Sequence, residues 1–159
     1  DFDHVLLKLN NSFVKFFKFI YKIRLYILMI NFLSKYKFIF YLSNLVLIFL
    51  YLFPGSFLGC FLYDDCKLQP QITRNFLISS NHLYAFFLLS VIGFFTYKNS
   101  NRLNFIIIYL VLLSVILEIL HIIIPDRSFE FSDLFGNLIG VLGIVIINLL
   151  HKKYENSKN

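Results

Sequence analysis

The chain is poor in charged residues, and this shortage excludes an ordinary soluble domain. Of its 159 residues, 15% are charged and 58% are hydrophobic, whereas soluble domains usually contain about 25% charged residues. The composition therefore predicts a single-domain integral membrane protein. The net charge of +6 does not indicate a nucleic-acid-binding module, because the basic residues flank apolar segments instead of lining a soluble groove or helix face.

Cysteine and tryptophan are also scarce. Cys60 and Cys66 are too few for a disulfide scaffold and lack the C-x-x-C spacing of a zinc site. We expect them near or beyond the outer membrane surface, where they either form a disulfide or remain two unpaired small residues. Tryptophan is absent, while the 21 phenylalanines and 10 tyrosines fit an AT-rich codon bias, so aromatic content alone does not indicate a ligand.

The N-terminal segment, residues 1–37, is basic and contains the one methionine of the chain, Met29. Because the sequence begins with Asp1, either it is truncated at the front, or the native start is Met29 and residues 1–28 are not native. Residues 12–35 mix cations with aromatic and aliphatic residues, which predicts a basic amphipathic helix in the lipid headgroup region. No small-residue cleavage site follows, so we do not expect a removable signal peptide.

Apolar segments predict an all-α integral membrane four-helix bundle in residues 38–151, followed by a polar cytoplasmic tail, residues 152–159. The expected spans are residues 38–53, continued after a Pro-Gly break by 57–63, then 76–97, 103–124 and 134–150. Twelve of the 15 Lys and Arg residues lie in the N-terminal segment, in the turn between the second and third spans, or in the tail. The positive-inside rule then places both termini in the cytoplasm and the other two loops outside.

The third span carries the residues that are most costly to place in a membrane. Glu118 and His121 are three positions apart and share one helix face, with Glu118 about 9 Å from the expected end of the span. With His82, one to two turns inside the second span, they are the candidate catalytic residues. The candidate ligand-binding residues at the turn into the fourth span are Arg127, Asp126, Asp133 and Asn137. We expect all seven to converge at the outward-facing end.

Simpler explanations stay open for each of them. Glu118 and His121 can simply bond one another to stabilise helix packing. Asp133 can be a first-turn carboxylate that interacts favourably with the helix dipole, following an N-cap at Ser132. Arg127 can be an interfacial anchor and Asp126 a solvated loop residue. The Glu-x-x-His spacing is that of di-iron bundles, but it occurs once. The sequence therefore predicts no metal and no cofactor.

Small residues line one face of the expected fourth span. Gly136, Gly140 and Gly143 follow a helical spacing together with Asn137, which predicts helix packing with a closely approaching backbone. Asn137 can donate and accept hydrogen bonds across such a contact. We expect this face to pack against the Glu118 face of the third span.

In these residues the chain resembles the VanZ-like family of small bacterial membrane proteins. The family features at the C-terminal end are matched by Glu118, Pro125 with Arg127, Asp133, and Asn137 with Gly140. His82 and Pro54-Gly55 match two further features, whereas Ile78 and Ser79 replace a family Asp-Lys pair. The resemblance implies a multi-pass protein of the bacterial cytoplasmic membrane. The family's namesake is associated with low-level resistance to the glycopeptide antibiotic teicoplanin.

These expectations lead to two functional hypotheses. The first is a cell-envelope protein whose outward-facing pocket binds or modifies a lipid-linked or cell-wall-related ligand and affects glycopeptide sensitivity. The alternative is a non-catalytic membrane scaffold or accessory subunit that docks a partner through its Gly/Asn helix face. A proton-coupled transporter is less well supported, because no inverted repeat is visible. The expected partners are the bilayer and this ligand, without nucleic acid; substrate turnover and oligomeric state stay open.

Overall fold

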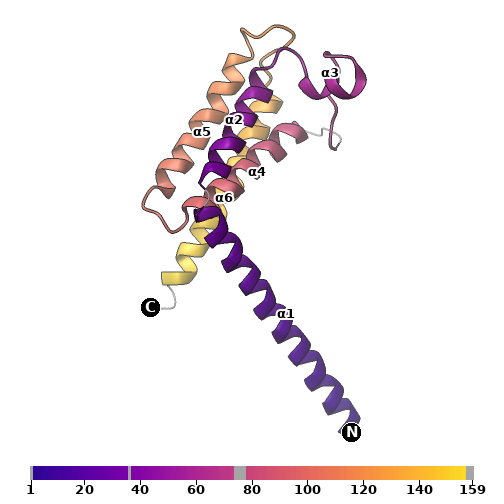
Figure 1. The fold of residues 1–159 in the computed structure, drawn as a ribbon, viewed down its shortest axis with the longest axis vertical. Coiled ribbons are helices and arrows are strands. Elements are labelled where there is room, and N and C mark those ends of the chain that lie inside the picture. Colours follow the sequence, from indigo (N-terminus) through magenta and orange to yellow (C-terminus); the bar gives the residue numbers. More distant parts are fainter. Residues whose placement is uncertain (1, 36, 74–77, 157–159) are drawn as a thin grey trace.

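The computed structural model describes residues 2–35, 37–73 and 78–156 as helices joined by turns and loops, without a strand in these ranges. The helices are α1 (Phe2–Lys35), α2 (Phe38–Leu52), α3 (Phe57–Tyr63), α4 (Ser80–Tyr97), α5 (Leu103–Leu120) and α6 (Phe131–Asn156). The all-α prediction is confirmed. Helices α2, α4, α5 and α6 pack together into a helical body, and α1 projects away from it (Figure 1).

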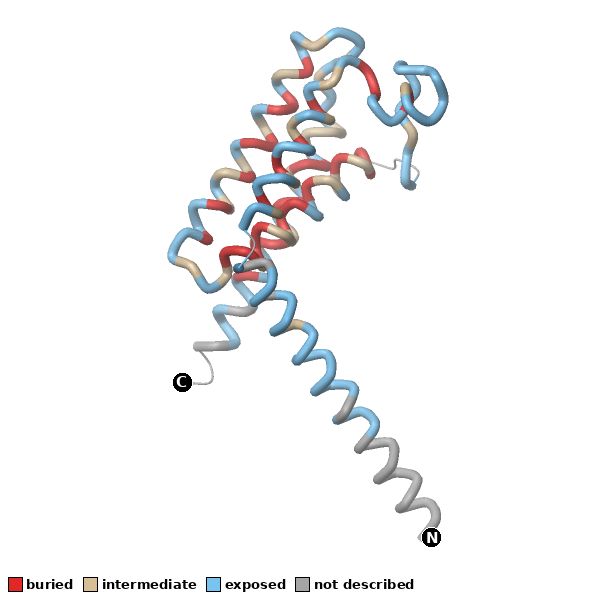
Figure 2. Tube along the Cα trace, in the orientation of Figure 1, coloured by how far each residue is buried: buried red, intermediate tan, exposed pale blue. Residues whose placement is uncertain are grey.

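The core of the helical body is apolar, and so is much of its surface. Phe86, Leu110 and Val141 are buried between the helices, and Figure 2 shows the buried positions on the facing sides of the helical body. On the outer face of α5, Phe105 and Ile108 are exposed. An apolar outer face of this kind suits a helix surrounded by lipid.

Two helices in the described part of the chain are long and apolar enough to cross a membrane, namely Leu103–Leu120 and Phe131–Tyr154. Counting the α2–α3 pair as one broken span gives three. Helix α4 is not among these candidates, so the prediction that residues 76–97 form a span stays a prediction. Its expected start at Phe76 lies outside the described residues.

Helix α1 is longer than the expected amphipathic segment. It contacts the helical body at α4, where Lys98 Nζ donates to the Tyr26 hydroxyl at 3.0 Å and the Tyr26 and Phe95 rings meet edge to face. Most of the α1 side chains that are described are exposed (Figure 2). The helical character of residues 12–35 is confirmed, and their location in the headgroup region stays a prediction.

The helix ends around the candidate site differ from the expected ones. Helix α5 ends at Leu120 instead of Ile124. The amides of residues 121–123 donate to the carbonyl three residues earlier, as in a 3₁₀ turn, and not four residues earlier as in an α-helix; one example is Ile123 N to Leu120 O at 3.1 Å. The Pro125 that follows has no N–H and its ring disfavours helix in the preceding residue. Glu118 therefore lies in the last turn of α5 instead of six residues inside it.

The starts of α4 and α6 also need correction. Helix α4 begins at Ser80, so His82 lies in its first turn and not one to two turns inside. Helix α6 begins at Phe131, because the Glu130 carbonyl accepts the Asp133 and Leu134 amides at 3.1 Å each. The expected N-cap, Ser132, is consequently already inside the helix. Asp133 does lie in the first turn, as predicted.

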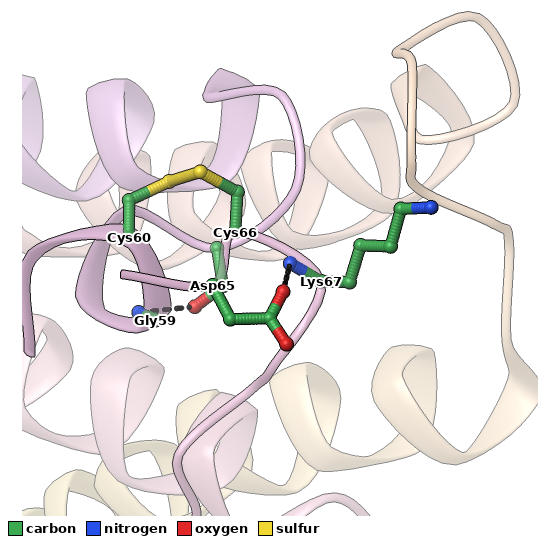
Figure 3. The surroundings of a disulfide bond; sticks show 6 residues. Gly59, Cys60, Asp65, Cys66 and Lys67 are labelled. Carbon is green, nitrogen blue, oxygen red and sulfur yellow. Dashed lines mark hydrogen bonds between the residues drawn. A yellow bond between two sulfur atoms is a disulfide. The ribbon is translucent and has the colours of Figure 1, made fainter. Parts of the chain in front are cut away.

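The break after α2 turns the chain sharply aside. Helix α3 lies at 80° to α2, so it does not prolong the first span in a straight line. Gly55 has φ +66°, and a Cβ there would lie 2.5 Å from the Cys66 carbonyl oxygen, so this turn requires glycine. Of the two alternatives for the cysteines, the structure contains the Cys60–Cys66 disulfide (Figure 3). The Gly55 amide donates to the Pro125 carbonyl at 3.2 Å, which ties this segment to the α5–α6 turn.

The glycines of α6 pack against a different helix from the one predicted. A Cβ on Gly136 would lie 2.7 Å from the Ser79 carbonyl oxygen, and one on Gly140 would lie 2.7 Å from that of Leu83, so both face α4 and not α5. Gly143 is less crowded, since its Cβ would lie 3.4 Å from the Phe87 ring. Successive helix positions are about 100° apart, so Asn137, next to Gly136, points to α5 instead.

Candidate functional site

A cluster of polar side chains is buried at one end of the helical body, where α2 and α5 end and α4 and α6 begin. It consists of Tyr51, His82, Glu118, His121, Asp133 and Asn137. The exposed fractions of Glu118 and Asn137 are 0%, and that of His121 is 1%. We call this group the polar cluster. Five of its members were predicted from the sequence to converge, and they do.

Glu118 is at the centre of the polar cluster and has a neighbour on every side. Its Oε1 accepts the Glu130 amide at 3.1 Å and lies 3.4 Å from His121 Nδ1. Its Oε2 accepts from Asn137 Nδ2 at 3.4 Å and lies 3.8 Å from His82 Nδ1. A buried carboxylate without such partners would be very costly, so these contacts explain how α5 tolerates it.

His82 lies between two carboxylates from different helices. Its Nε2 is 3.3 Å from Asp133 Oδ2 on α6, and its Nδ1 faces Glu118 on α5. Among the described residues, Nδ1 is buried and has no hydrogen-bond partner. A buried ring nitrogen without a partner costs about 1–3 kcal/mol, so His82 is incompletely satisfied by the protein itself.

Tyr51, in the last turn of α2, is a member that sequence reasoning missed. Its hydroxyl donates to Asn137 Oδ1 at 2.6 Å, and its ring stacks on that of His121 with centroids 5.7 Å apart. His121 Nε2 lies 3.1 Å from the Tyr51 carbonyl. Because a carbonyl only accepts, this nitrogen carries a hydrogen, and the other, Nδ1, faces Glu118. Nothing in the apolar run around Tyr51 distinguishes it from the other aromatic residues.

Arg127 approaches the polar cluster from the α5–α6 turn. It donates from Nη2 to the Leu50 carbonyl at 3.4 Å, whereas its Nε is buried without a partner among the described residues. Partial burial lowers the pKa of the Arg127 guanidinium, and the nearby Asp133 and Tyr51 oppose that decrease. An arginine remains charged at neutral pH in any case. One N–H of a cation is thus available to an anionic ligand.

A cavity of about 300 Å³ opens beside these groups. His82, His121 and Arg127 contribute its polar wall, while most of the remaining lining is apolar. A second cavity of about 350 Å³ continues between α2 and α4 and has an apolar lining. The two share the residues Leu50, Tyr51, Ala85 and Leu88. The two cavities are therefore neighbours: His82, His121 and Arg127 line the first, and the second is lined by apolar residues apart from Ser43 and Tyr51.

Asp126 does not join the other predicted residues. It is exposed in the α5–α6 turn with φ 56°, away from the buried groups, because the turn directs Arg127 inward instead. Glu130, next to α6, contributes its amide to Glu118, while its side chain accepts from Ser128 and Ser132 at the surface. The bond from the Glu130 amide to Glu118 was not predicted, because a backbone amide is present in every residue except proline and therefore does not depend on the side chain.

One further grouping was not visible in the sequence. His82, Glu118 and Asp133 each offer one ligand atom, and these three atoms lie within 4.8 Å of one another. They come from α4, α5 and α6, so no sequence spacing connects them. The predicted absence of a metal rested on spacing within one helix.

Fold and site together define a helical protein with two to three candidate membrane spans and a buried polar cluster at one end. A comparison with protein-family models gives no match, and comparisons with curated proteins and with solved structures give none either. The resemblance to VanZ-like proteins therefore rests on the residues named above.

Proposed function

We propose that this chain is a VanZ-like protein of the bacterial cytoplasmic membrane that binds an anionic, lipid-linked ligand at its outward-facing end. The ligand belongs to the lipid-linked or other precursors of the cell wall, and binding it affects sensitivity to glycopeptides such as teicoplanin. In this proposal α2, α4, α5 and α6 form a four-span bundle, and both termini are cytoplasmic. The 18 residues of α4 extend about 27 Å, close to the hydrocarbon thickness of about 30 Å.

The observation that carries the proposal is the cavity with Arg127 at its polar end. The buried Nε of Arg127 lacks a partner among the described residues, and the cavity that Arg127 lines shares four lining residues with the apolar cavity between α2 and α4. A phosphate or carboxylate at this end would gain a charge-assisted hydrogen bond from the guanidinium. A hydrocarbon chain attached to it would fill the apolar continuation. A water-soluble anion would leave that continuation without an occupant.

Two features support the outward orientation. The Cys60–Cys66 disulfide lies on the segment that is bonded to the α5–α6 turn, and disulfides persist in oxidising compartments outside the cytoplasm. Twelve of the 15 Lys and Arg residues lie in the terminal segments or in the turn between α4 and α5, which the positive-inside rule assigns to the cytoplasm. Both features support an orientation in which the polar cluster faces outward.

His82, His121 and Glu118 are the groups that would serve any proton transfer to the bound ligand. Each histidine has a ring nitrogen within 4 Å of Glu118, at 3.4 Å for His121 and 3.8 Å for His82. General acid or base catalysis needs such groups within hydrogen-bonding reach of the reacting atoms. The cavity wall contains both histidines, which meets this requirement for a ligand bound there.

Arg127→Ala tests the proposal. Vesicles containing a polyprenyl phosphate, and matched vesicles without it, are mixed with the purified chain, and retained lipid is measured by mass spectrometry. We expect the wild type to retain polyprenyl phosphate and Arg127→Ala to retain at least about tenfold less, the loss of one charge-assisted bond. The matched control is Arg102→Ala, an exposed arginine at the other end of α5. If all three proteins retain equal amounts of polyprenyl phosphate, the proposal that Arg127 binds an anionic lipid is wrong.

Drug sensitivity of producing cells supplies the second readout. Cells with the wild-type chain and cells with Arg102→Ala should share one teicoplanin sensitivity, and cells with Arg127→Ala should differ from both. Membrane amounts of each variant are measured alongside. If sensitivity is the same in all cells at equal amounts, the proposed link to the cell wall is wrong.

We do not propose partner docking through the Gly/Asn helix face. Gly136 and Gly140 are in contact with the α4 backbone of the same chain, and Asn137 is buried against Tyr51 and Glu118. This face is therefore already occupied within the chain.

A further inference from the structure

Three side chains from three helices converge around His82 in a way that packing alone does not explain. One ring nitrogen of His82 and one carboxylate oxygen each of Glu118 and Asp133 lie within 4.8 Å of one another. Burial covers nine-tenths or more of the His82 side chain and all of that of Glu118. From this arrangement we infer that His82, Glu118 and Asp133 form a binding site for a divalent transition-metal ion of the Zn²⁺ class.

The unpartnered nitrogen of His82 is the independent sign of a missing ligand. Its Nδ1 is buried, has no hydrogen-bond partner among the described residues, and faces Glu118 Oε2 at 3.8 Å. That separation is too long for a hydrogen bond. It is close to the spacing of about 3.4 Å between two donors that share a tetrahedral ion at about 2.1 Å. An ion between them would satisfy both atoms.

The third donor requires a small movement. An ion takes one nitrogen of the ring, and the Asp133 carboxylate lies 3.3 Å from the other, Nε2, so it has to move toward the ion to reach an ordinary bond length. Asp133 lies in the first turn of α6, and its side chain is 14% exposed. It is less constrained than the other two donors and can make this adjustment.

The donor set selects the class of ion. One imidazole nitrogen with two carboxylate oxygens suits Zn²⁺ and similar transition metals, whereas Mg²⁺ and Ca²⁺ prefer oxygen ligands alone. The local charge also favours a bound cation. Two neighbouring carboxylates face His82, and neither forms a salt bridge with Lys or Arg within 4.0 Å in the described ranges. A divalent cation would neutralise both carboxylates.

The residues around these donors already hold them in place. Glu118 Oε1 accepts the Glu130 amide and lies beside His121, which leaves Oε2 directed at His82. Asn137 is held by the Tyr51 hydroxyl and donates to the same carboxylate. Such surrounding hydrogen bonds are typical of metal ligands.

Three protein ligands leave one position free for water or a ligand oxygen, as in catalytic zinc sites. Because His82 and Arg127 line the same cavity, that position lies beside the proposed binding place of the anionic group. The metal site itself does not depend on the proposed lipid ligand, because it is built from the protein donors alone.

Zinc binding by the full chain is the test. The protein is purified with a histidine-free tag, stripped with a chelator, and titrated with Zn²⁺ by calorimetry in detergent, with metal content checked by mass spectrometry. We expect one Zn²⁺ per chain, and an affinity at least about 100-fold lower for Asp133→Asn and Glu118→Gln. The matched control is Asp126→Asn, the exposed carboxylate of the adjacent turn, which should bind as the wild type does. A second control replaces His4 and His151, the two histidines outside the polar cluster, by alanine.

A folding readout separates loss of the site from loss of the fold. Asp133→Asn keeps the side-chain shape, so its helical circular dichroism should equal that of the wild type. Zn²⁺ should raise the unfolding temperature of the wild type and of Asp126→Asn, and leave that of Asp133→Asn unchanged. The inference is overturned if the wild type takes up no Zn²⁺, if Asp133→Asn binds it equally well, or if Mg²⁺ displaces it. Zinc binding without polyprenyl phosphate binding would refute the proposed function and leave the metal site standing.

Discussion

The two ends of helix α4 are built on different principles. At its start, His82 is buried between carboxylates of α5 and α6. At its other end, the Tyr97 hydroxyl donates to the Tyr41 hydroxyl at 2.9 Å, and Lys98 reaches Tyr26. Aromatic rings and a lysine suit a membrane interface. Packing among aromatic side chains thus explains one end of α4, whereas the buried polar cluster at the other end indicates a functional site.

The same contrast appears in how closely α4 and α6 approach. Near the polar cluster, Gly136 and Gly140 bring the backbones into contact, whereas Gly143 meets only the Phe87 ring. Close backbone approach at the polar end brings His82 and Asp133 together across the two helices. The glycines therefore position the site even though they do not take part in its chemistry.

The largest expected effect is that of Glu118→Ala. It leaves His121, Asn137 and the Glu130 amide without their shared partner, and removing one member of a buried charged network costs about 3–5 kcal/mol. Unfolding by denaturing detergent, followed by circular dichroism, measures this. Tyr97→Phe at the other end is the reference and should lose less than about 1 kcal/mol. If Glu118→Ala and Tyr97→Phe lower the free energy of unfolding by similar amounts, the two ends of α4 do not differ in the way described above.

An intermediate effect is expected from Gly140→Ala. The added Cβ would lie 2.7 Å and 2.8 Å from backbone atoms of Leu83 and Phe87, which cannot move aside singly. Overpacking of about 1–3 kcal/mol then exceeds the gain in helix propensity of about 1 kcal/mol. Gly143→Ala meets only ordinary contacts, so it should be neutral or stabilising. The free energies of unfolding of the two variants are compared. If Gly140→Ala is as stable as Gly143→Ala, or more stable than the wild type, the close approach of α6 to α4 at Gly140 is wrong.

A third comparison separates two tyrosine hydroxyls. Tyr51→Phe leaves the buried Asn137 Oδ1 without its donor at 2.6 Å, which should cost about 1–3 kcal/mol. Tyr97→Phe removes a bond to Tyr41, which is 58% exposed and can find another partner. Parallel unfolding curves give the difference. If Tyr51→Phe is the milder change, Tyr51 is not an integral member of the polar cluster.

Part of the site could be predicted from the sequence. Glu118 and His121 are three positions apart, and the end of α5 brings them to 3.4 Å, as their spacing predicted. The helical character of residues 38–52 and 103–120 follows equally from their apolar runs. The convergence of His82, Asp133 and Asn137 was predicted because each lies near an end of its helix, and the alternation of spans brings those ends together.

The particular neighbours of each helix could not be predicted from the sequence. Helical spacing identified the glycine face of α6 but not its neighbour, which is α4 and not α5. Tyr51 joins the polar cluster because α2 packs against α4 and α5, which buries this side chain and brings its hydroxyl to Asn137. The early end of α5 depends on turn bonds that follow from Pro125 and from the contacts of the loop. Such features arise from the three-dimensional arrangement of several segments.

The most direct test of the central claim is to identify the molecule that occupies the cavity beside His82, His121 and Arg127. The chain is extracted with its surrounding native lipid, and molecules that remain bound are identified by native mass spectrometry. We predict a lipid-linked anion bound to the wild type and to Arg102→Ala, and strongly depleted in Arg127→Ala. Only bulk phospholipids, in the same proportions in all three proteins, would contradict a ligand site at this end of the molecule.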